Sequence, residues 1–301
     1  MTEAAMKAPK EYARVEVNGV ELAYIEAGPT ASAKAVQERP PLVICLHGFP
    51  DSAHSFDELL PVLAAAGYRA VAPFMRGYFP SAIPGDGDYA ITTLAGDVLA
   101  LIDALGESDA ILIGHDWGGM AAYTAANIAP AKVRKLVVLA VPHMAATENS
   151  FAQLKRSWYV LFFQLPWLPE KRVARHNFAF IDRLYRAWSP NWDEAEFNLA
   201  PVKRALAAPG SLVAALGYYR RMIRGASKSV YDVMSRITTV PTLWFLGEAD
   251  GSIGPEVLAN TADACTGPFE IVSLPRVGHF IHREAPAEFQ SRLLAFIGPA
   301  Q

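Results

Sequence analysis

The chain has 301 residues, of which 52% are hydrophobic, and a formal net charge of −3. This length allows one large α/β domain or a domain with an insertion, and the composition is that of a folded globular protein. The small net charge and the lack of a Lys/Arg stripe disfavour a nucleic-acid partner. No apolar stretch approaches the length of a membrane span, and residues 1–15 carry charges throughout, without the apolar core of a secretory signal. We therefore expect no membrane insertion and a cytoplasmic location.

The first half of the chain predicts a hairpin followed by alternating strands and helices. Residues 15–17 and 20–25 flank Asn18-Gly19, a dipeptide that tolerates the positive φ angles of a tight turn. Residues 28–41 predict a surface loop. Beyond it we expect strands at residues 42–46, 69–72, 110–113 and 136–141, and helices near 55–66, 92–105 and 118–128. This alternation is typical of βαβ units, which form an α/β fold with a mostly parallel central sheet flanked by helices.

The alternation stops after Pro142. Residues 143–236 contain no convincing strand, are rich in aromatic residues and Arg, and show helical spacing around residues 158–164, 172–188 and 212–224. Strand patterns return at 241–246 and 269–274, and an amphipathic helix is expected near 284–297. We therefore expect a core domain made of residues 1–142 and 237–301, into which residues 143–236 are inserted as a helical cap.

The most informative motif is GHDWGG at residues 114–119, which follows an apolar run and precedes a helix of small residues. This is the strand, sharp turn and helix of a nucleophile elbow, in which glycines allow a strained backbone to lift one side chain off the sheet. Serine is the usual residue at that position, and here it is Asp116. A carboxylate that attacks carbon forms an alkyl ester on the enzyme. The expected substrate therefore carries an electrophilic sp3 carbon, as in an epoxide or an alkyl halide.

Polar residues follow three other predicted strands, at the edge where open α/β sheets place their sites. The strand at 42–46 is followed by the sequence HGFP, whose loop can aim the backbone N–H of Phe49 at a developing oxyanion. The N–H of Trp117 is the expected second donor. Asp250 and His279 follow the two strands predicted near the C-terminus. The order nucleophile, acid, histidine along the chain is the one expected for this type of fold.

These residue types suggest a reaction in two steps. Asp116 is expected to be ionised at neutral pH and to attack carbon without help from a base. His279 would then deprotonate a water that attacks the ester, while Asp250 orients the imidazole and stabilises its charged form. Glu248 is a rival for the acid role, but its spacing is less favourable than that of Asp250.

The remaining histidines are expected to have structural roles. His47 and His115 belong to the turns of their motifs. The others have no evident partner and are expected at the surface or in packing: His54, His143, His176 and His282.

Over residues 12–297 these motifs resemble the α/β-hydrolase superfamily. The combination of HGFP, GHDWGG and VGHF is similar to soluble epoxide hydrolases and, less closely, to haloalkane dehalogenases, which also use an aspartate nucleophile. The resemblance implies an enzyme that opens a small apolar epoxide to a vicinal diol, with no metal and no organic cofactor. A haloalkane dehalogenase is the alternative, although many of those place Asn where this chain has Phe49. A ligand-binding module without catalysis is disfavoured, because Asp116, Asp250 and His279 are all present.

The resemblance also implies two cap tyrosines that hydrogen-bond the epoxide oxygen and protonate the leaving alkoxide. Tyr159 has the family's spacing to the pair Phe163-Gln164, and Tyr219 occupies the aromatic-Tyr-Arg step of a later helix, with Tyr218 as the alternative. Phenols suit that task, because a strained ether opens faster when its oxygen is protonated. The competing interpretation is that these tyrosines pack the cap.

Large apolar residues of the predicted cap are expected to line a substrate pocket or, equally, to hold the cap against the core. The candidates for substrate binding are Trp158, Phe163, Trp167 and Phe178. A monomer and a homodimer are both compatible with the sequence.

Overall fold

A computed structural model of the chain describes residues 12–29, 39–147, 150–225, 227–258 and 260–300. Within these ranges the centre of the molecule is a sheet with the strand order β1-β2-β4-β3-β5-β6-β7-β8. β1 pairs with β2 and β2 with β4 in antiparallel fashion, and all other neighbours are parallel. The strands are β1 (Ala13–Val17), β2 (Val20–Ala27), β3 (Leu42–Leu46), β4 (Arg69–Pro73), β5 (Ala110–His115), β6 (Val133–Leu139), β7 (Thr242–Gly247) and β8 (Phe269–Leu274).

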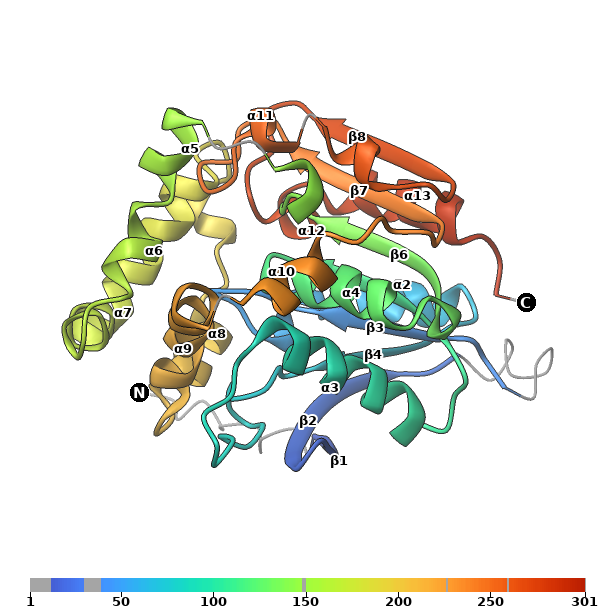
Figure 1. Cartoon of the computed structure of the whole chain (residues 1–301), viewed down its shortest axis with the longest axis horizontal. Coiled ribbons are helices and arrows are strands. Elements are labelled where there is room, and N and C mark those ends of the chain that lie inside the picture. Colours follow the sequence, from blue (N-terminus) through green and yellow to red (C-terminus); the bar gives the residue numbers. More distant parts are fainter. Residues whose placement is uncertain (1–11, 30–38, 148–149, 226, 259, 301) are drawn as a thin grey trace, which may run out of the picture.

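Helices flank the sheet (Figure 1), which confirms the expected α/β class. Those that connect or follow the strands are α2 (Leu59–Ala65), α3 (Ile91–Ala104), α4 (Trp117–Ile128), α11 (Pro255–Leu258), α12 (Ile281–Glu284) and α13 (Pro286–Ile297). Short 3-10 turns complete this part of the chain: η1 (Ala53–Phe56), η2 (Pro130–Lys132) and η5 (Thr261–Ala264). None of the described helices is long and apolar enough to cross a membrane.

The N-terminal hairpin forms as predicted. Val17 is paired with Val20, and the two residues between them have positive φ angles, 46° at Asn18 and 70° at Gly19. Most of the loop predicted at residues 28–41 lies outside the described residues, as does most of the N-terminal segment 1–15.

Most core elements lie within one or two residues of their predicted ranges, because central parallel strands are continuous apolar runs. Three predictions were wrong at the boundaries. The helix expected near 55–66 is divided into η1 and α2, and α2 begins only at Leu59. The strand expected at 136–141 is β6, which begins earlier and ends at Leu139, because Ala140 turns away with φ of 57°. The helix expected near 284–297 is divided into α12 and α13, because Pro286 begins a new helix.

Between β6 and β7 the described residues contain helices and no strand, apart from one isolated bridge between Thr238 and Cys265. The helices are η3 (Met144–Ala146), α5 (Phe151–Arg156), α6 (Trp158–Phe162), α7 (Leu168–Trp188), η4 (Glu194–Glu196), α8 (Ala200–Ala207), α9 (Ser211–Arg224) and α10 (Lys228–Met234). Most of this helical segment lies to the left of the sheet in Figure 1. α7 begins four residues before the expected start, and its backbone is not helical at residues 175–178.

Candidate active site

Asp116 lies on the sharp turn between β5 and α4. Its backbone has φ of 51° and ψ of −121°, a conformation that is strained for a residue with a Cβ atom. Glycine is required at two positions that pack closely here, one in this turn and one in the loop after β3. A Cβ at Gly118 would lie 2.1 Å from the carbonyl oxygen of Leu46, and one at Gly48 would lie 2.3 Å from Oδ1 of Asp116. The structure therefore has the strand, turn and helix that the GHDWGG motif predicts.

The carboxyl group of Asp116 is buried and faces backbone donors. The N–H of Phe49 donates a hydrogen bond to Oδ1 at 2.7 Å. Burial raises the pKa of Asp116 to about 6, against the opposing effects of His279 and of the N–H groups of Phe49 and Trp117. The structure thus moves this pKa well above the ordinary value assumed in the sequence analysis, although it remains below neutrality.

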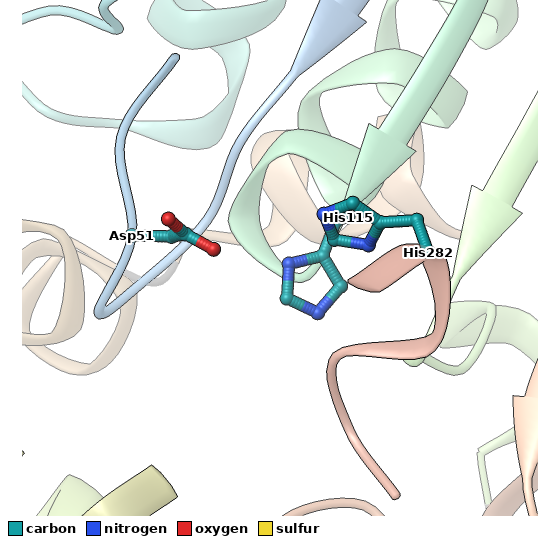
Figure 2. Close-up of side chains that lie close together, drawn as sticks. All are labelled: Asp51, His115 and His282. Carbon is teal, nitrogen blue, oxygen red and sulfur yellow. The ribbon is translucent and has the colours of Figure 1, made fainter. Parts of the chain in front are cut away.

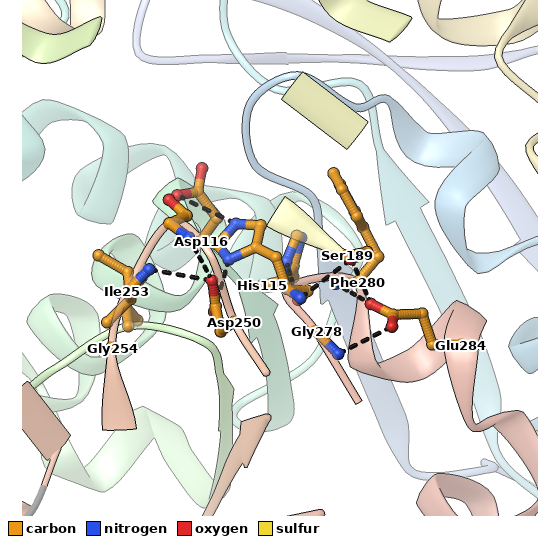
Figure 3. Close-up of polar contacts among 12 residues, drawn as sticks. His115, Asp116, Ser189, Asp250, Ile253, Gly254, Gly278, Phe280 and Glu284 are labelled. Atoms are coloured by element: carbon orange, nitrogen blue, oxygen red, sulfur yellow. Dashed lines mark hydrogen bonds and ion pairs between the residues drawn. The ribbon is translucent and has the colours of Figure 1, made fainter. Parts of the chain in front are cut away.

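His279 lies between Asp116 and Asp250, and Figure 3 labels the two aspartates. Nδ1 of His279 donates to Oδ2 of Asp250 at 2.8 Å, so in the neutral imidazole the lone pair is on Nε2. Oδ1 of Asp250 accepts from the N–H groups of Ser252 and Ile253 at 2.7 and 2.9 Å. Nε2 of His279 lies 3.8 Å from Oδ2 of Asp116, which is longer than a hydrogen bond. The three residues named from the sequence are therefore together, with the imidazole between the two carboxyl groups.

The charges around His279 favour its protonated form. Burial lowers the pKa of His279, but the carboxylates of Asp250 and Asp116 outweigh burial, so the pKa is raised above its ordinary value. The rival acid Glu248 is exposed and accepts a hydrogen bond from the hydroxyl of Ser273. Glu248 is thus occupied elsewhere, and Asp250 is the carboxylate that contacts the histidine.

A half-buried carboxylate, Glu284, which the sequence analysis missed, holds the backbone around His279 (Figure 3). Glu284 accepts hydrogen bonds from the hydroxyl of Ser189 at 2.5 Å and from the N–H groups of Gly278 and Phe280 at 2.8 and 2.9 Å. The N–H of His279 in turn donates to the Ser189 oxygen at 3.1 Å. Because Ser189 follows α7, this network joins the helical segment to the histidine loop. An acidic residue five positions after a histidine gives no specific sequence signal for such a role.

The three candidate tyrosines differ in what their hydroxyl groups contact. The hydroxyl of Tyr218 donates to the carbonyl of Arg76 at 2.7 Å. The hydroxyl of Tyr159 lies 3.0 Å from the Ser252 oxygen. The hydroxyl of Tyr219 is buried and has no hydrogen-bond partner among the described residues. The geometry therefore distinguishes the two candidates for the second phenol donor: the Tyr219 hydroxyl is free to bind a ligand, whereas the Tyr218 hydroxyl is already hydrogen-bonded.

Aromatic rings cluster beside Phe49, whose N–H contacts the carboxyl group of Asp116. The ring of Tyr219 lies 5.4 Å from that of Phe49, 5.1 Å from that of Phe163 and 5.8 Å from that of Tyr159. Burial, and after it the charge of Asp116, raises the pKa of both candidate phenols. Both hydroxyl groups consequently remain protonated and able to donate.

The four residues predicted to bind substrate do not all lie at this site. Phe163 does, as its ring contacts show. Trp158 contacts the outer side of this group: its ring centroid is 6.4 Å from that of Tyr159, and half of its surface is exposed. Trp167 is exposed, with the Lys171 ammonium above its ring, and Phe178 borders a separate groove on α7 and α8. The structure thus does not bring Trp167 or Phe178 to the carboxylate, because both flank or interrupt α7 in left-handed conformations.

Two histidines of the motifs hold their turns as expected. Nε2 of His47 accepts from the N–H of Met75 at 3.1 Å. Nε2 of His115 donates to the carbonyl of His279 at 3.0 Å. The expectation that His143 has no partner was wrong, because its ring is buried and lies 3.2 Å from the hydroxyl of Thr238.

His282 is also buried and bonded, in a polar group with Asp51 and His115 (Figure 2). Among the described residues this is the one group whose carboxylate and imidazole atoms lie close enough, within 4.8 Å, to hold a metal ion. Asp51 and Nε2 of His282 are already hydrogen-bonded, whereas Nδ1 of His115 has no partner among the described residues. The Ser55 hydroxyl donates to Asp51 at 2.6 Å and accepts from His282 at 2.6 Å, and the Arg283 guanidinium lies 3.9 Å from Asp51. The group fits a hydrogen-bonded network between the HGFP loop and α12 better than a metal centre.

Comparison with known proteins agrees with this fold. The model of the α/β-hydrolase fold family matches residues 41–286. The AB hydrolase superfamily protein YfhM of Bacillus subtilis is 30% identical, over 94% of this chain and 96% of its own length. Epoxide hydrolase 4 of Homo sapiens is 30% identical over 91% of this chain and 75% of its own. The crystal structure of Bacillus megaterium epoxide hydrolase in complex with an inhibitor has a TM-score of 0.79 and 25% identity, covering 95% and 99% of the two chains.

The fold and the turn that carries Asp116 define the chain as a member of the α/β-hydrolase fold family. Within that fold, the relatives and the solved structures place it in the epoxide hydrolase family, as the sequence motifs predict.

Replacing Asp116 with Asn should stabilise the fold at neutral pH. The carboxyl group has a pKa of about 6 in the folded chain and an ordinary value of 3.8, so its stabilising contribution is present below pH 3.8 and is lost as the pH rises through about 6. Asn does not ionise. The free energy of unfolding of Asp116→Asn, minus that of the parent, should therefore grow over this interval by up to about 3 kcal/mol. Chemical unfolding near pH 4 and near pH 8 measures the change, and a difference independent of pH would contradict it.

Proposed function

We propose that this protein hydrolyses epoxides to vicinal diols through a covalent alkyl ester on Asp116. The observation that carries the proposal is the pairing of a carboxylate at the nucleophile elbow with His279, whose Nε2 has no hydrogen-bond partner and is directed at that carboxylate. A serine hydrolase needs its histidine to deprotonate the nucleophile, whereas an ionised carboxylate attacks carbon unaided. The names of the relatives, which include several epoxide hydrolases, support the same substrate class.

In the first step a carboxylate oxygen of Asp116 attacks one epoxide carbon, and the bond from that carbon to the epoxide oxygen breaks. The electron pair of that bond moves to the oxygen, which needs a proton or strong hydrogen bonds. Tyr159 and Tyr219 are proposed to hold this oxygen, because their hydroxyl groups are protonated, buried and close to Asp116. Two convergent phenol donors favour an oxygen leaving group over the halide of the alternative dehalogenase.

In the second step His279 acts as the base. Its Nε2 takes a proton from a water whose oxygen attacks the carbonyl carbon of the ester, and Asp250 stabilises the imidazolium that forms. The oxyanion of the tetrahedral intermediate is proposed to accept from the N–H groups of Phe49 and Trp117, which already face the resting carboxyl group. Collapse of the intermediate expels the diol oxygen, which takes the proton from the imidazolium. The carboxyl group that forms carries the second proton of the water and passes it to the phenol that protonated the epoxide oxygen, so the carboxylate is restored with one oxygen from water.

The helical segment is proposed to act as a cap, comprising residues 143–236 over a core of residues 1–142 and 237–301. Both candidate phenols come from this segment and meet the core at Phe49, Trp117 and Ser252. The aromatic rings beside Phe49 make this region apolar, which suits a small apolar epoxide and strengthens the electrostatic interactions at Asp116.

The variant His279→Gln should form the ester but fail to hydrolyse it. Alkylation requires only the ionised carboxylate, while hydrolysis requires a base. Intact-protein mass spectrometry after incubation with styrene oxide should show an adduct with the mass of one epoxide. His176→Gln changes an exposed histidine in the same way and should turn over like the parent. Normal turnover by His279→Gln, with no adduct, would show that His279 is not the base.

Removing both phenol hydroxyl groups should slow alkylation. General acid assistance contributes about 10²–10⁴-fold, so the Tyr159→Phe/Tyr219→Phe variant should lose at least that factor, and each single variant should lose less. Stopped-flow quenching of tryptophan fluorescence measures the alkylation rate. Tyr218→Phe is the matched control, because its hydroxyl is bonded to the Arg76 carbonyl, and it should alkylate at the parent rate. A double variant that alkylates as fast as the parent would leave these tyrosines with a packing role only.

A further inference from the structure

The outer side of α5 and α6 carries an apolar stripe that faces solvent. Large apolar residues recur at alternating intervals of three and four over α5, α6 and the turn after α6, a spacing typical of one side of a helix. They are between 44% and 84% exposed: Phe151, Leu154, Trp158, Leu161 and Leu165. On the inner side, Tyr159 of α6 and Phe163 after it are buried at the candidate active site, and α5 buries the polar Gln153. The exposed apolar residues are therefore not used inside the molecule.

The stripe continues onto the start of α7. Trp167 and Leu168 are exposed beside it, and a groove of about 790 Å³ runs between α5, α6 and α7. Trp158, Phe162 and Phe180 contribute to its lining. Figure 1 draws these three helices along one edge of the molecule. We call the five residues of the stripe together with Trp167 and Leu168 the outer apolar surface.

The charge around the outer apolar surface is strongly positive, although the whole chain is not. Residues 151–188 contain seven Lys or Arg residues and two acidic residues, within a chain of net charge −3. Both acidic residues are used in ion pairs with other helices, Glu170 with Arg220 at 2.6 Å and Asp182 with Lys203 at 2.7 Å.

Of the four cations that line the groove, Arg156 is paired with Glu256 and the other three have no such partner among the described residues. Lys155, Arg172 and Arg183 line it and are exposed, and none of them has a carboxylate within ion-pairing distance among the described residues. The ammonium group of Lys171, which is also on α7, lies 4.9 Å from the centre of the exposed Trp167 ring. Apolar side chains and unpaired cations therefore share one face.

We propose that the outer apolar surface docks on a lipid membrane that contains anionic lipids. A bilayer interface offers an apolar layer for Phe, Leu and Trp side chains and, beside it, negative headgroups for Lys and Arg. A second copy of this chain fits less well, because a two-fold contact would set the same cations against one another. A free polyanion would pair with the cations but would leave the apolar stripe exposed to water.

Vesicle sedimentation with the full chain tests the proposal. The protein should bind vesicles of phosphatidylcholine with phosphatidylserine more strongly than vesicles of phosphatidylcholine alone, and high salt should weaken the binding. Phe151→Ser/Leu154→Ser and Lys155→Glu/Arg172→Glu should each lower the partition coefficient on the anionic vesicles about tenfold or more. These four positions are exposed, so circular dichroism should show each variant folded like the parent.

Two control variants make the same chemical changes elsewhere on the surface. Ile237→Ser removes an exposed apolar residue before β7, and Lys228→Glu reverses an exposed charge at the start of α10. Both should bind anionic vesicles within about twofold of the parent. The proposal would be overturned if the parent bound neither kind of vesicle, or if all four variants bound alike. It would also be overturned if the parent formed a dimer that Phe151→Ser/Leu154→Ser abolished while vesicle binding was unchanged.

Discussion

Burying the carboxyl group of Asp116 at the end of β5 is unfavourable, and much of the surrounding structure serves to offset it. The turn that carries the group has positive φ, and glycine at positions 48 and 118 lets neighbouring backbone approach within contact distance. The N–H groups of Phe49 and Trp117 and the imidazole of His279 lower the carboxyl pKa, but burial prevails and leaves it at about 6. The carboxylate is thus charged near neutral pH yet poorly solvated, which is the state expected of a reactive nucleophile.

The two aspartates beside His279 differ in how they are held. Asp250 is bonded on both oxygens, to the imidazole and to two backbone N–H groups, which suits an orienting role. Asp116 receives backbone donors alone and faces Nε2 across 3.8 Å. Behind the imidazole, Glu284 fixes the backbone of the histidine loop through Gly278, Phe280 and Ser189. The position of the base therefore depends on a contact with the end of α7, in the helical segment.

The sequence was sufficient for most of the fold and for Asp116, Asp250 and His279, because each follows a strand of the parallel part of the sheet. It was insufficient where local chemistry overrides the apolar pattern. Near the start of β6, the Arg134 side chain bonds to Asp109 and the Lys135 side chain bonds to carbonyls at the end of α13. The apolar residues after Leu139 belong to a turn and not to the strand. In the helical segment the apolar spacing could not show which face is inside. Trp167 was therefore assigned to the pocket although it lies in solvent. Glu284 was missed because its partners are backbone groups and one distant serine.

The central claim, that Asp116 bonds covalently to the substrate, is tested most directly by a single turnover in 18O-labelled water with enzyme in excess over epoxide. The account predicts a first diol whose new oxygen is unlabelled, because it comes from the carboxylate, and label in Asp116 that peptide mass spectrometry can locate. Labelled oxygen in that first diol, with an unlabelled Asp116, would mean that water attacks the epoxide directly and would contradict the account.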